Sequence, residues 1–359
     1  MALSGAVIDT MQRESRGRER VSSSRRSWYS PAAPRDVAIV VPVGGPARAW
    51  PRAARSLARL EPPPGEIVVV IDGRHDAVAA VAVEIGATVL VLDERSGPAR
   101  ARNRGARVAI GDILLFVDAD VEVTSDLAAR VVGILTAHPD IAAVFGSYDD
   151  APADGGLVSQ YRNLLHHFVH QTGRQEASTF WAGCGAVRRE AFCEVGGFDE
   201  GRAVPSIEDI ELGSRLLRAG HTIRLEKSLQ VKHLKAWRFT DMVATDLWRR
   251  AVPWTELMLR DGRLVNDLNV SVRERASVLV AFVAVLALAG SPRWPRLLGA
   301  GGAALLLMVA LNAGFFEFLG RRRGAVFAAA AIPLHVTYLL VCGFGFGVGV
   351  IRHLVGRRR

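Results

Sequence analysis

Apolar and polar residues follow two different patterns over the first third of the chain. Short continuous apolar runs, which predict buried strands, are separated by longer stretches with helical spacing. Such alternation predicts a parallel sheet with helices on its faces, in which ligands bind at the carboxyl ends of the strands. The predicted strands lie at 36–43, 65–73, 88–93 and 112–120, and the predicted helices at 47–60, 75–87 and 97–111.

The apolar pattern changes after about residue 276. Three apolar segments follow, at 277–290, 297–320 and 325–351. The last two are about as long as a helix that crosses a bilayer, whereas the first is short and fits either a tilted span or an interfacial segment. A buried helical core is the alternative. Three such segments in succession favour a transmembrane region over residues 276–359, with two to four segments.

Clusters of arginine flank these segments. Arg273 and Arg275 precede the first, residues 321–323 separate the second from the third, and residues 357–359 follow the third. Basic residues favour the cytoplasmic side of a membrane, and three simple spans cannot place all three clusters there. Either the last segment folds back, broken at Pro333 and at its glycines, or one cluster lies on the far side.

Composition narrows the class of partner and the compartment. Half of the 359 residues are hydrophobic, the mean hydropathy is +0.19 and the formal charge is +9. The excess of arginine suits phosphates, nucleic acid or an acidic membrane surface. Residues 1–35 are polar and Arg-rich and lack the apolar core of a signal peptide, so we expect a disordered basic tail there. Three scattered cysteines predict no disulfide framework and fit a reduced cytoplasmic compartment.

Two carboxylates end the fourth predicted strand, in the stretch LLFVDAD. Asp118 and Asp120 are separated by one small residue. Two hard oxygen ligands, together with phosphate oxygens and water, make a good site for Mg²⁺ or Mn²⁺. The alternative is that both aspartates begin a turn, where Asp is common. The first strand is followed by no dinucleotide-binding glycine fingerprint, and the sequence has no P-loop, so the acidic pair is the favoured ligand-binding device.

A second acidic pair, Glu208 and Asp209, lies where a helix is predicted to begin at Ser206. Ser206 and Asp209 have the spacing of a capping box, and the two acids suit the positive end of a helix dipole. This structural explanation and a catalytic one both remain open from the pattern alone. Downstream, His233 follows a short apolar stretch and is flanked by Lys232.

Other candidates for chemistry are weaker. His166 and His170 have helical spacing that can bind zinc, but no third ligand accompanies them, so a partly buried or membrane-facing helix is favoured. Cys184 lacks the His and acid partners of a cysteine nucleophile. Arg102 and Arg107 are expected on a solvated helix face.

Taken together, several stretches resemble the family 2 glycosyltransferases of the GT-A fold. They run in the order of the family and cover about residues 36–240. They are AIVVPV, IVVVIDG, GPARARNRGARVAIGDILLFVDAD, FWAGCGAVRREAFCEVGGFDE, IEDIELGSRLLRAGHTI and VKH. The resemblance implies a GT-A catalytic domain over 36–240, which is an α/β, Rossmann-like, mostly parallel sheet with helices on both faces. Interfacial helices or a linker over 241–275, containing Trp248 and Arg249, would join it to the transmembrane α-helices.

The resemblance also implies roles for individual residues. Asp118 and Asp120 would hold Mn²⁺ or Mg²⁺ on the two phosphates of a nucleotide-sugar donor, and His233 would complete the metal shell. Asp209 would be the general base that takes a proton from the acceptor hydroxyl, with Glu208 positioning the acceptor.

Further donor contacts are implied in the same way. One residue lies where the family contacts the nucleobase, although the family often has two adjacent acids there. The helix over 97–111 supplies polar groups near the phosphates, and the loop FWAGCGAVRR lies beside the sugar, with Trp181, Gly183 and Cys184 shaping the pocket. The implied donor-binding set is Asp72, Arg100, Asn103, Asp118, Trp181, Gly183 and Lys232.

The sequence therefore predicts a metal-dependent, inverting glycosyltransferase of the hexosyltransferase type. We expect a multi-pass protein of the cell membrane with a cytoplasmic catalytic domain, and no nucleic-acid partner. Processive synthases of the family carry a Gln-x-x-Arg-Trp signature that this chain lacks, so we expect one sugar to be added to a lipid or membrane-associated acceptor. The alternatives are a polyprenyl-phosphate sugar synthase, an inactive nucleotide-sugar-binding membrane scaffold and, less favoured, a nucleotidyltransferase.

Overall fold

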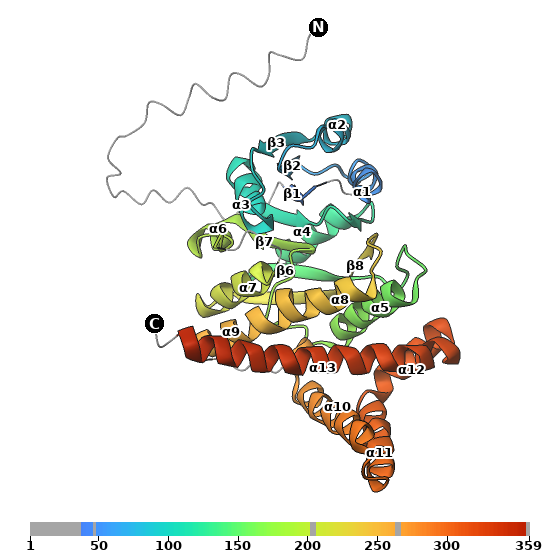
Figure 1. Cartoon of the computed structure of the whole chain (residues 1–359). Coiled ribbons are helices and arrows are strands. Elements are labelled where there is room, and N and C mark those ends of the chain that lie inside the picture. The colour runs from blue at the N-terminus through green and yellow to red at the C-terminus, as the bar shows by residue number, and fades with distance from the viewer. Residues whose placement is uncertain (1–36, 46–47, 202–205, 263–266, 357–359) are drawn as a thin grey trace. The chain divides into compact units, whose positions relative to one another are not determined.

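The computed structural model describes residues 37–45, 48–201, 206–262 and 267–356 (Figure 1). The basic tail predicted over residues 1–35 lies outside these ranges. The strands are β1 (Val37–Val43), β2 (Glu66–Asp72), β3 (Thr88–Leu92), β4 (Ile113–Val117), β5 (Val121–Glu122), β6 (Ile141–Tyr148), β7 (Cys184–Arg188) and β8 (Thr222–His233).

Helices occur throughout the described part of the chain and dominate its C-terminal third. Those among the strands are α1 (Trp50–Leu57), α2 (Asp76–Glu84), α3 (Pro98–Val108), α4 (Leu127–Ala137), α5 (Leu157–Thr172), α6 (Arg189–Glu194) and α7 (Glu208–Arg218). Those after β8 are α8 (Phe239–Ala244), the π-helix η1 (Thr245–Ala251), α9 (Val252–Asp261), the 3₁₀-helix η2 (Leu268–Val270), α10 (Val272–Gly290), α11 (Arg296–Leu311), α12 (Ala313–Arg323) and α13 (Ala325–Gly356).

One sheet runs through the molecule in the strand order β3-β2-β1-β4-β7-β6-β8-β5. The pairs β1 with β2, β1 with β4, and β2 with β3 are parallel, as the sequence predicts. β7 lies antiparallel between β4 and β6, and β5 lies antiparallel to the end of β8. The predicted α/β class is therefore confirmed, with antiparallel strands added to the parallel half.

Two apolar cores fill the two faces of this sheet. Successive residues of a strand point to opposite faces, so Leu115 packs with α1, α2 and α4, while Leu114 packs with α3, α6 and α7. β4 is buried along its whole length. Because its core ends at Val117, the next residue, Asp118, is the first that reaches the edge of the sheet.

A third core joins the sheet unit, by which we mean β1–β8 with α1–α9, to the C-terminal helices. Tyr161 of α5 packs there with Phe315 of α12 and Leu334 of α13. Residues 34–359 form one compact unit, and the domain boundaries predicted at residues 240 and 275 stay a prediction.

Among the described residues, α13 alone is long and apolar enough to cross a membrane as a single helix. α11 and α12 would make a second candidate if taken together, but they meet at an angle of 72°. Of the two alternatives for the last segment, a break at Pro333 and the glycines is wrong, because α13 is continuous through them. The structure thus offers one or two candidate spans where the sequence suggested two to four.

Candidate active site

The first acidic pair lies at the carboxyl end of β4, where strand pairing brings a histidine to it. The backbone N–H of Asp118 donates to the carbonyl of Gly183 at 3.2 Å. Val121 lies opposite His233 in the pairing of β5 with β8. This register places the His233 Nε2 3.7 Å from the Asp120 Oδ2. The predicted partnership of Asp120 and His233 is therefore present in the geometry.

Aromatic packing fixes the histidine. The His233 ring is buried and stacks on Tyr148, with centroids 4.1 Å apart and planes 12° apart. Burial on its own would raise the pKa of Asp120, but His233 and the nearby Lys235 hold that pKa below its ordinary value. Asp120 therefore stays ionised across the neutral range, as a metal ligand requires.

A buried arginine joins the two acidic pairs. Arg102 of α3 donates to the Asp118 Oδ1 at 2.7 Å and to the Glu208 Oε1 at 2.9 Å, and its side chain is only 6% exposed. Burial alone would lower the pKa of the guanidinium, but Asp118, Glu208 and Asp209 raise it above its ordinary value. The expectation that Arg102 lies on a solvated face is wrong; Arg107, which pairs with Glu200 at the surface, does lie there.

The second acidic pair begins α7 and differs from the first in its partners. Asp209 accepts hydrogen bonds from the backbone N–H of Ala182 at 3.2 Å and of Ile210 at 2.8 Å. Burial raises the pKa of Asp209 to about 6, and the charge of Glu208 adds to the shift. A carboxylate with that pKa can hold or release a proton near neutral pH, which suits a general base.

The predicted capping box at α7 is wrong. The helix begins at Glu208, and its first turn has no side-chain cap. The Ser206 Oγ donates instead to the carbonyl of Arg249 at 3.2 Å, while Glu208 accepts from the Ser206 N–H at 2.9 Å. Capping by Ser206 therefore does not account for Asp209, whereas the helix-dipole explanation remains open because both acids lie in the first turn of α7.

The fit of a divalent metal can be judged from these side chains. In the described part of the chain, no group of three or more His, Cys, Asp or Glu side chains is assembled for a metal. Asp120 and His233 form a two-ligand edge, with Asp118 beside it but engaged by Arg102. Mg²⁺ and similar ions are commonly held by one or two carboxylates together with substrate phosphates and water. The residues therefore fit a metal that arrives with a diphosphate.

The loop before β7 adds an aromatic wall. Trp181 lies against Tyr148 and His166, with ring centroids 4.8 Å from each. A Cβ on Gly183 would lie 2.4 Å from the Trp181 ring, so only glycine fits beneath the indole. The predicted sugar loop is thus shorter than the sequence suggested, because residues from Cys184 onward form a strand.

Four residues of the implied donor-binding set lie in other settings. Asp72 accepts from the backbone N–H groups of Ser96 and Gly97 at 2.6 and 2.9 Å, and so holds the loop that leads into α3. Arg100 is exposed on α3. The Lys232 Nζ lies 2.6 Å from the Asp149 Oδ2, and Lys232 points away from the face of β8 that carries His233.

Asn103 is the fourth. Its amide donates to the Phe198 carbonyl and to Glu200, both at 2.8 Å, and its oxygen accepts from the Phe198 N–H at 2.9 Å. These contacts clamp the loop after α6 rather than face Asp118. The donor-binding roles of Asp72, Arg100, Asn103 and Lys232 stay predictions.

The weaker candidates take structural positions. His170 is buried on α5, and its Nδ1 lies 3.0 Å from the carbonyl of Gly146. Its ring lies 4.0 Å from that of His166, so the expected partly buried helix is confirmed. Burial raises the pKa of the Cys184 thiol to about 12, which leaves it a poor nucleophile.

Two contributors, Arg102 and Tyr148, were missed by sequence reasoning. Ala99, Arg102, Asn103 and Ala106 recur at intervals of three and four, which puts Arg102 on the buried face of α3. That spacing was the available signal. Tyr148 ends a strand that no local pattern singled out.

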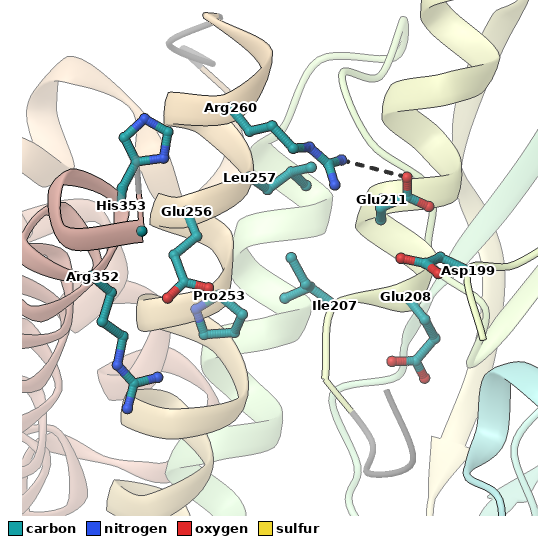
Figure 2. A pocket seen from close by; sticks show the side chains of 11 residues that line it. Asp199, Ile207, Glu208, Glu211, Pro253, Glu256, Leu257, Arg260, Arg352 and His353 are labelled. Atoms are coloured by element: carbon teal, nitrogen blue, oxygen red, sulfur yellow. Dashed lines mark ion pairs between the residues drawn. The ribbon is translucent and has the colours of Figure 1, made fainter. Parts of the chain in front are cut away.

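A cavity of about 330 Å³ is lined by Glu208 of the second acidic pair (Figure 2). Figure 2 shows Glu208 and Asp199 on one side, and Arg352 and His353 of α13 on the other. α9 supplies further lining residues, including Leu257. The cavity thus connects the site to the helices that follow the sheet unit.

Comparison with known proteins assigns the family. The sequence profile of the Glycosyl transferase family 2 matches residues 39–196. Residues 39–196 belong to glycosyltransferase family 2. The segment matched by this glycosyltransferase profile contains Asp72, Asp118 and Asp120, whereas Asp209 and His233 lie beyond it.

Individual relatives agree with this family assignment. The pre-mycofactocin glycosyltransferase of Mycobacterium tuberculosis is 29% identical over 221 residues, which are 58% of this chain and 45% of that protein. Cellulose synthase 2 of Novacetimonas hansenii is 28% identical over 214 residues, which are 56% of this chain and 13% of that protein. The match thus spans less than half the length of either relative.

A solved structure supports the GT-A fold of this chain. The mannosyltransferase PcManGT from Pyrobaculum calidifontis, in complex with GDP-Man and Mn²⁺, superposes with a TM-score of 0.55 at 19% identity. The superposition covers 91% of this chain and 89% of that chain. At this level of identity the likeness concerns the fold alone.

Proposed function

We propose that the protein is an inverting, metal-dependent hexosyltransferase that moves one sugar from a nucleotide-diphosphate donor to a lipid or membrane-associated acceptor. The observation that carries the proposal is the bridge made by Arg102, which brings a metal-type acidic pair and a base-type acidic pair to one point. A turn motif or a helix cap would not require a buried arginine between two strongly separated segments.

Each side chain then has a defined task. Asp120 and His233 would hold the metal at the donor diphosphate, and Trp181 would flank the sugar. When bound, a divalent ion supplies Lewis-acid stabilisation of the charge on the departing diphosphate. The complex of PcManGT with GDP-Man and Mn²⁺ supports this class of donor and metal.

The proton transfer rests on Asp209. Its carboxylate takes the proton of the acceptor hydroxyl as that oxygen forms a bond to the anomeric carbon. The bond from the anomeric carbon to the diphosphate breaks, and the nucleoside diphosphate leaves with the bonding electrons. Attack from the face opposite the leaving group inverts the anomeric centre. Glu208, held by Arg102, would position the acceptor.

The position of the cavity supports an acceptor delivered by a membrane. One wall carries Glu208, and the other belongs to α9 and to the apolar helix α13. An acceptor anchored in lipid beside α13 would reach Asp209 through this opening. We place the sheet unit in the cytoplasm, because the arginines that flank the apolar segments favour that side.

The direct test is sugar transfer by the purified full chain. Protein in detergent is incubated with native lipid extract, Mn²⁺ and a panel of radiolabelled nucleotide sugars, and labelled lipid is separated from the donor. We expect one donor to give a product that carries a single added sugar. The double variant Asp120→Asn/Asp209→Asn is the control. Wild type that binds nucleotide tightly but transfers no sugar would indicate the scaffold.

A polyprenyl-phosphate acceptor is the second candidate. A phosphate oxygen is already ionised and needs less help from a base. Transfer to polyprenyl phosphate that persists in Asp209→Asn would favour this candidate over a hydroxyl acceptor.

A further inference from the structure

Among the described helices α13 is the longest, and it is bound to the sheet unit just before its start, in its middle and near its end. Immediately before α13, Arg322 pairs with Asp150 at 2.9 Å. In its middle, the His335 Nδ1 lies 3.0 Å from the hydroxyl of Tyr161 in α5. Near its end, the Arg352 guanidinium lies over the ring of Trp248, 5.4 Å from the centroid. Figure 1 shows α13 running along α8, α9 and α5.

Glycines make this contact close. A Cβ on Gly345 would lie 2.5 Å from the Cβ of Ala251, and one on Gly349 would lie 2.6 Å from the Cβ of Thr255. The two phenylalanines that flank Gly345 turn outward, and Phe344 and Phe346 are 58% and 48% exposed. One face of α13 therefore fits the backbone of η1 and α9, while the opposite face is apolar and uncovered.

If α13 crossed the membrane, the helices η1 and α9 that pack against it would lie in the bilayer as well. A helix of 32 residues is about 48 Å long, more than the hydrocarbon thickness of about 30 Å. The partners η1 and α9 carry Arg249 and Arg260, and η1 is fixed to α5 by the buried Arg162–Asp246 ion pair at 2.6 Å. Charged side chains inside the bilayer are costly. α13 is therefore placed to lie along a membrane surface rather than across it.

The hairpin of α10 and α11 has the opposite character. It extends away from α13 and the sheet unit (Figure 1). Its base is fastened by the Asn312 amide, which donates to the Ser277 Oγ at 3.0 Å. Its outer surface is apolar, with Leu279, Leu286 and Leu306 each 68–71% exposed. α10 is about 28 Å long, so this surface matches the depth of the hydrocarbon layer.

We propose that the α10–α11 hairpin is the membrane anchor of the described chain, and that α13 lies in the headgroup interface on the side of the sheet unit. This deepens the membrane association in the proposed function and rests on it. The covering partner is a bilayer with anionic headgroups, because Arg273 lies in the first turn of α10 at the base of the apolar hairpin, and α12, which follows the hairpin, ends in Arg321, Arg322 and Arg323. A hairpin returns the chain to its starting side, so Arg273 and Arg321 lie on the same side of the membrane.

Cysteine labelling tests the topology of α13. The full chain carries Cys193, which is exposed on α6 and marks the side of the sheet unit. Two proteins are compared, both with Cys342→Ala: one retains Cys193, and the other carries Cys193→Ser and Gly356→Cys. Each is treated with a membrane-impermeant maleimide in inverted and in right-side-out bacterial vesicles. We expect both cysteines to react in the same vesicle preparation. Reaction of the cysteine at 356 only in the opposite preparation would show that α13 crosses the membrane and would overturn the proposal.

Lysine substitutions test the hairpin. We expect Leu286→Lys to release much of the protein into alkaline carbonate, while Phe344→Lys and the control Val83→Lys, 65% exposed on α2, stay as the wild type. Release by Phe344→Lys but not by Leu286→Lys would overturn the proposal. Release of the wild type itself would do so too, and would indicate that a second copy covers the hairpin.

Sugar transfer in detergent separates this inference from the proposed function. Leu286→Lys should retain the transfer rate of the wild type, because the hairpin does not contribute to the acidic pairs. Active protein with the wrong topology would refute only the inference. Correct topology without transfer by any donor would refute only the proposed function.

Discussion

The two acidic pairs are chemically similar and share one arginine, yet their surroundings give their carboxylates different pKa values. The first pair is Asp118 with Asp120, and the second is Glu208 with Asp209. Asp120 faces His233, and its pKa is held below the ordinary value. Asp209 faces backbone N–H groups and an acidic neighbour, and its pKa is raised by burial to about 6. The comparison teaches that neighbours, rather than residue type, separate a permanently charged ligand from a group that can exchange a proton.

The largest expected effect concerns the first pair. Asp120→Asn should reduce sugar transfer to background, because the amide removes the charge that holds the metal beside His233. Chelation of the wild type by EDTA should do the same, and Mn²⁺ or Mg²⁺ should restore the rate. The measurement is product formation at saturating donor. Asp93→Asn, which alters an exposed ion pair with Arg74, is the matched control and should remain active. Full activity in EDTA would show that sugar transfer does not need a metal at the first pair.

The next effect concerns the second pair. Asp209→Asn keeps the size of the side chain but removes its basicity, so transfer should fall by about 100- to 10,000-fold. Binding of the nucleoside diphosphate, measured by calorimetry with Mn²⁺, should be close to that of the wild type. Loss of binding together with loss of folding would show that Asp209 acts structurally, and the two pairs would then not differ in the proposed way.

The pH dependence sharpens the same difference. Burial raises the pKa of Asp209 to about 6, so the base becomes ionised and the rate increases as the pH rises through about 6. The protonated form is favoured by folding, and any stability that it contributes is lost over the same rise in pH. The rate profile should therefore have an ascending limb near pH 6 that is missing from Asp209→Asn. A limb that persists in the variant would assign it to another group.

A smaller effect is expected at the bridge. Arg102→Lys keeps the charge but cannot hold Asp118 and Glu208 at once with the same planar geometry. Transfer should fall by about 10- to 100-fold, as for other groups that orient metal ligands. Arg107→Lys, at an exposed ion pair on the same helix, should have little effect. Equal effects of the two variants would contradict the bridging role.

The smallest effect is expected at Arg100, which the sequence assigns to donor binding. Its side chain is exposed on α3. Arg100→Ala should change the free energy of donor binding by about 0.5 kcal/mol, the usual scale of surface substitutions. The readout is the KM for the donor. A rise of more than about tenfold would show that the donor phosphates reach the outer face of α3.

The local apolar pattern predicted the parallel half of the sheet well. The antiparallel half was not predicted, because it depends on pairing between strands that are distant in sequence. The four predicted strands are present as β1–β4, and the helices between them as α1–α3, because their apolar periods are strong, although β4 ends at Val117 rather than at Asp120. The insertion of β7 between β4 and β6 depends on partners distant in sequence, which no local period encodes. The two acidic pairs were identified, but not the arginine that joins them, because an Arg on a helix usually faces solvent.

The C-terminal region shows a different limit of the sequence. Length and hydropathy identified α13 as a span, and they measure only what a helix contains. The contacts of Gly345 and Gly349 with η1 and α9 depend on the folded sheet unit, so hydropathy cannot distinguish a helix that is packed along a surface from one that crosses a membrane.

The neighbouring residues Arg102 and Asn103 have a consequence for recombining this protein with its relatives. Arg102 holds the start of α7, and Asn103 holds the loop after α6 through Phe198. A chimera joined between β6 and α5 would take Asp118 and Asp120 from one parent and Glu208, Asp209 and His233 from the other. Such a hybrid would keep the two acidic pairs in place only if α3 and residues 198–218 came from the same parent. An exchange of acceptor specificity therefore requires both segments to be exchanged together.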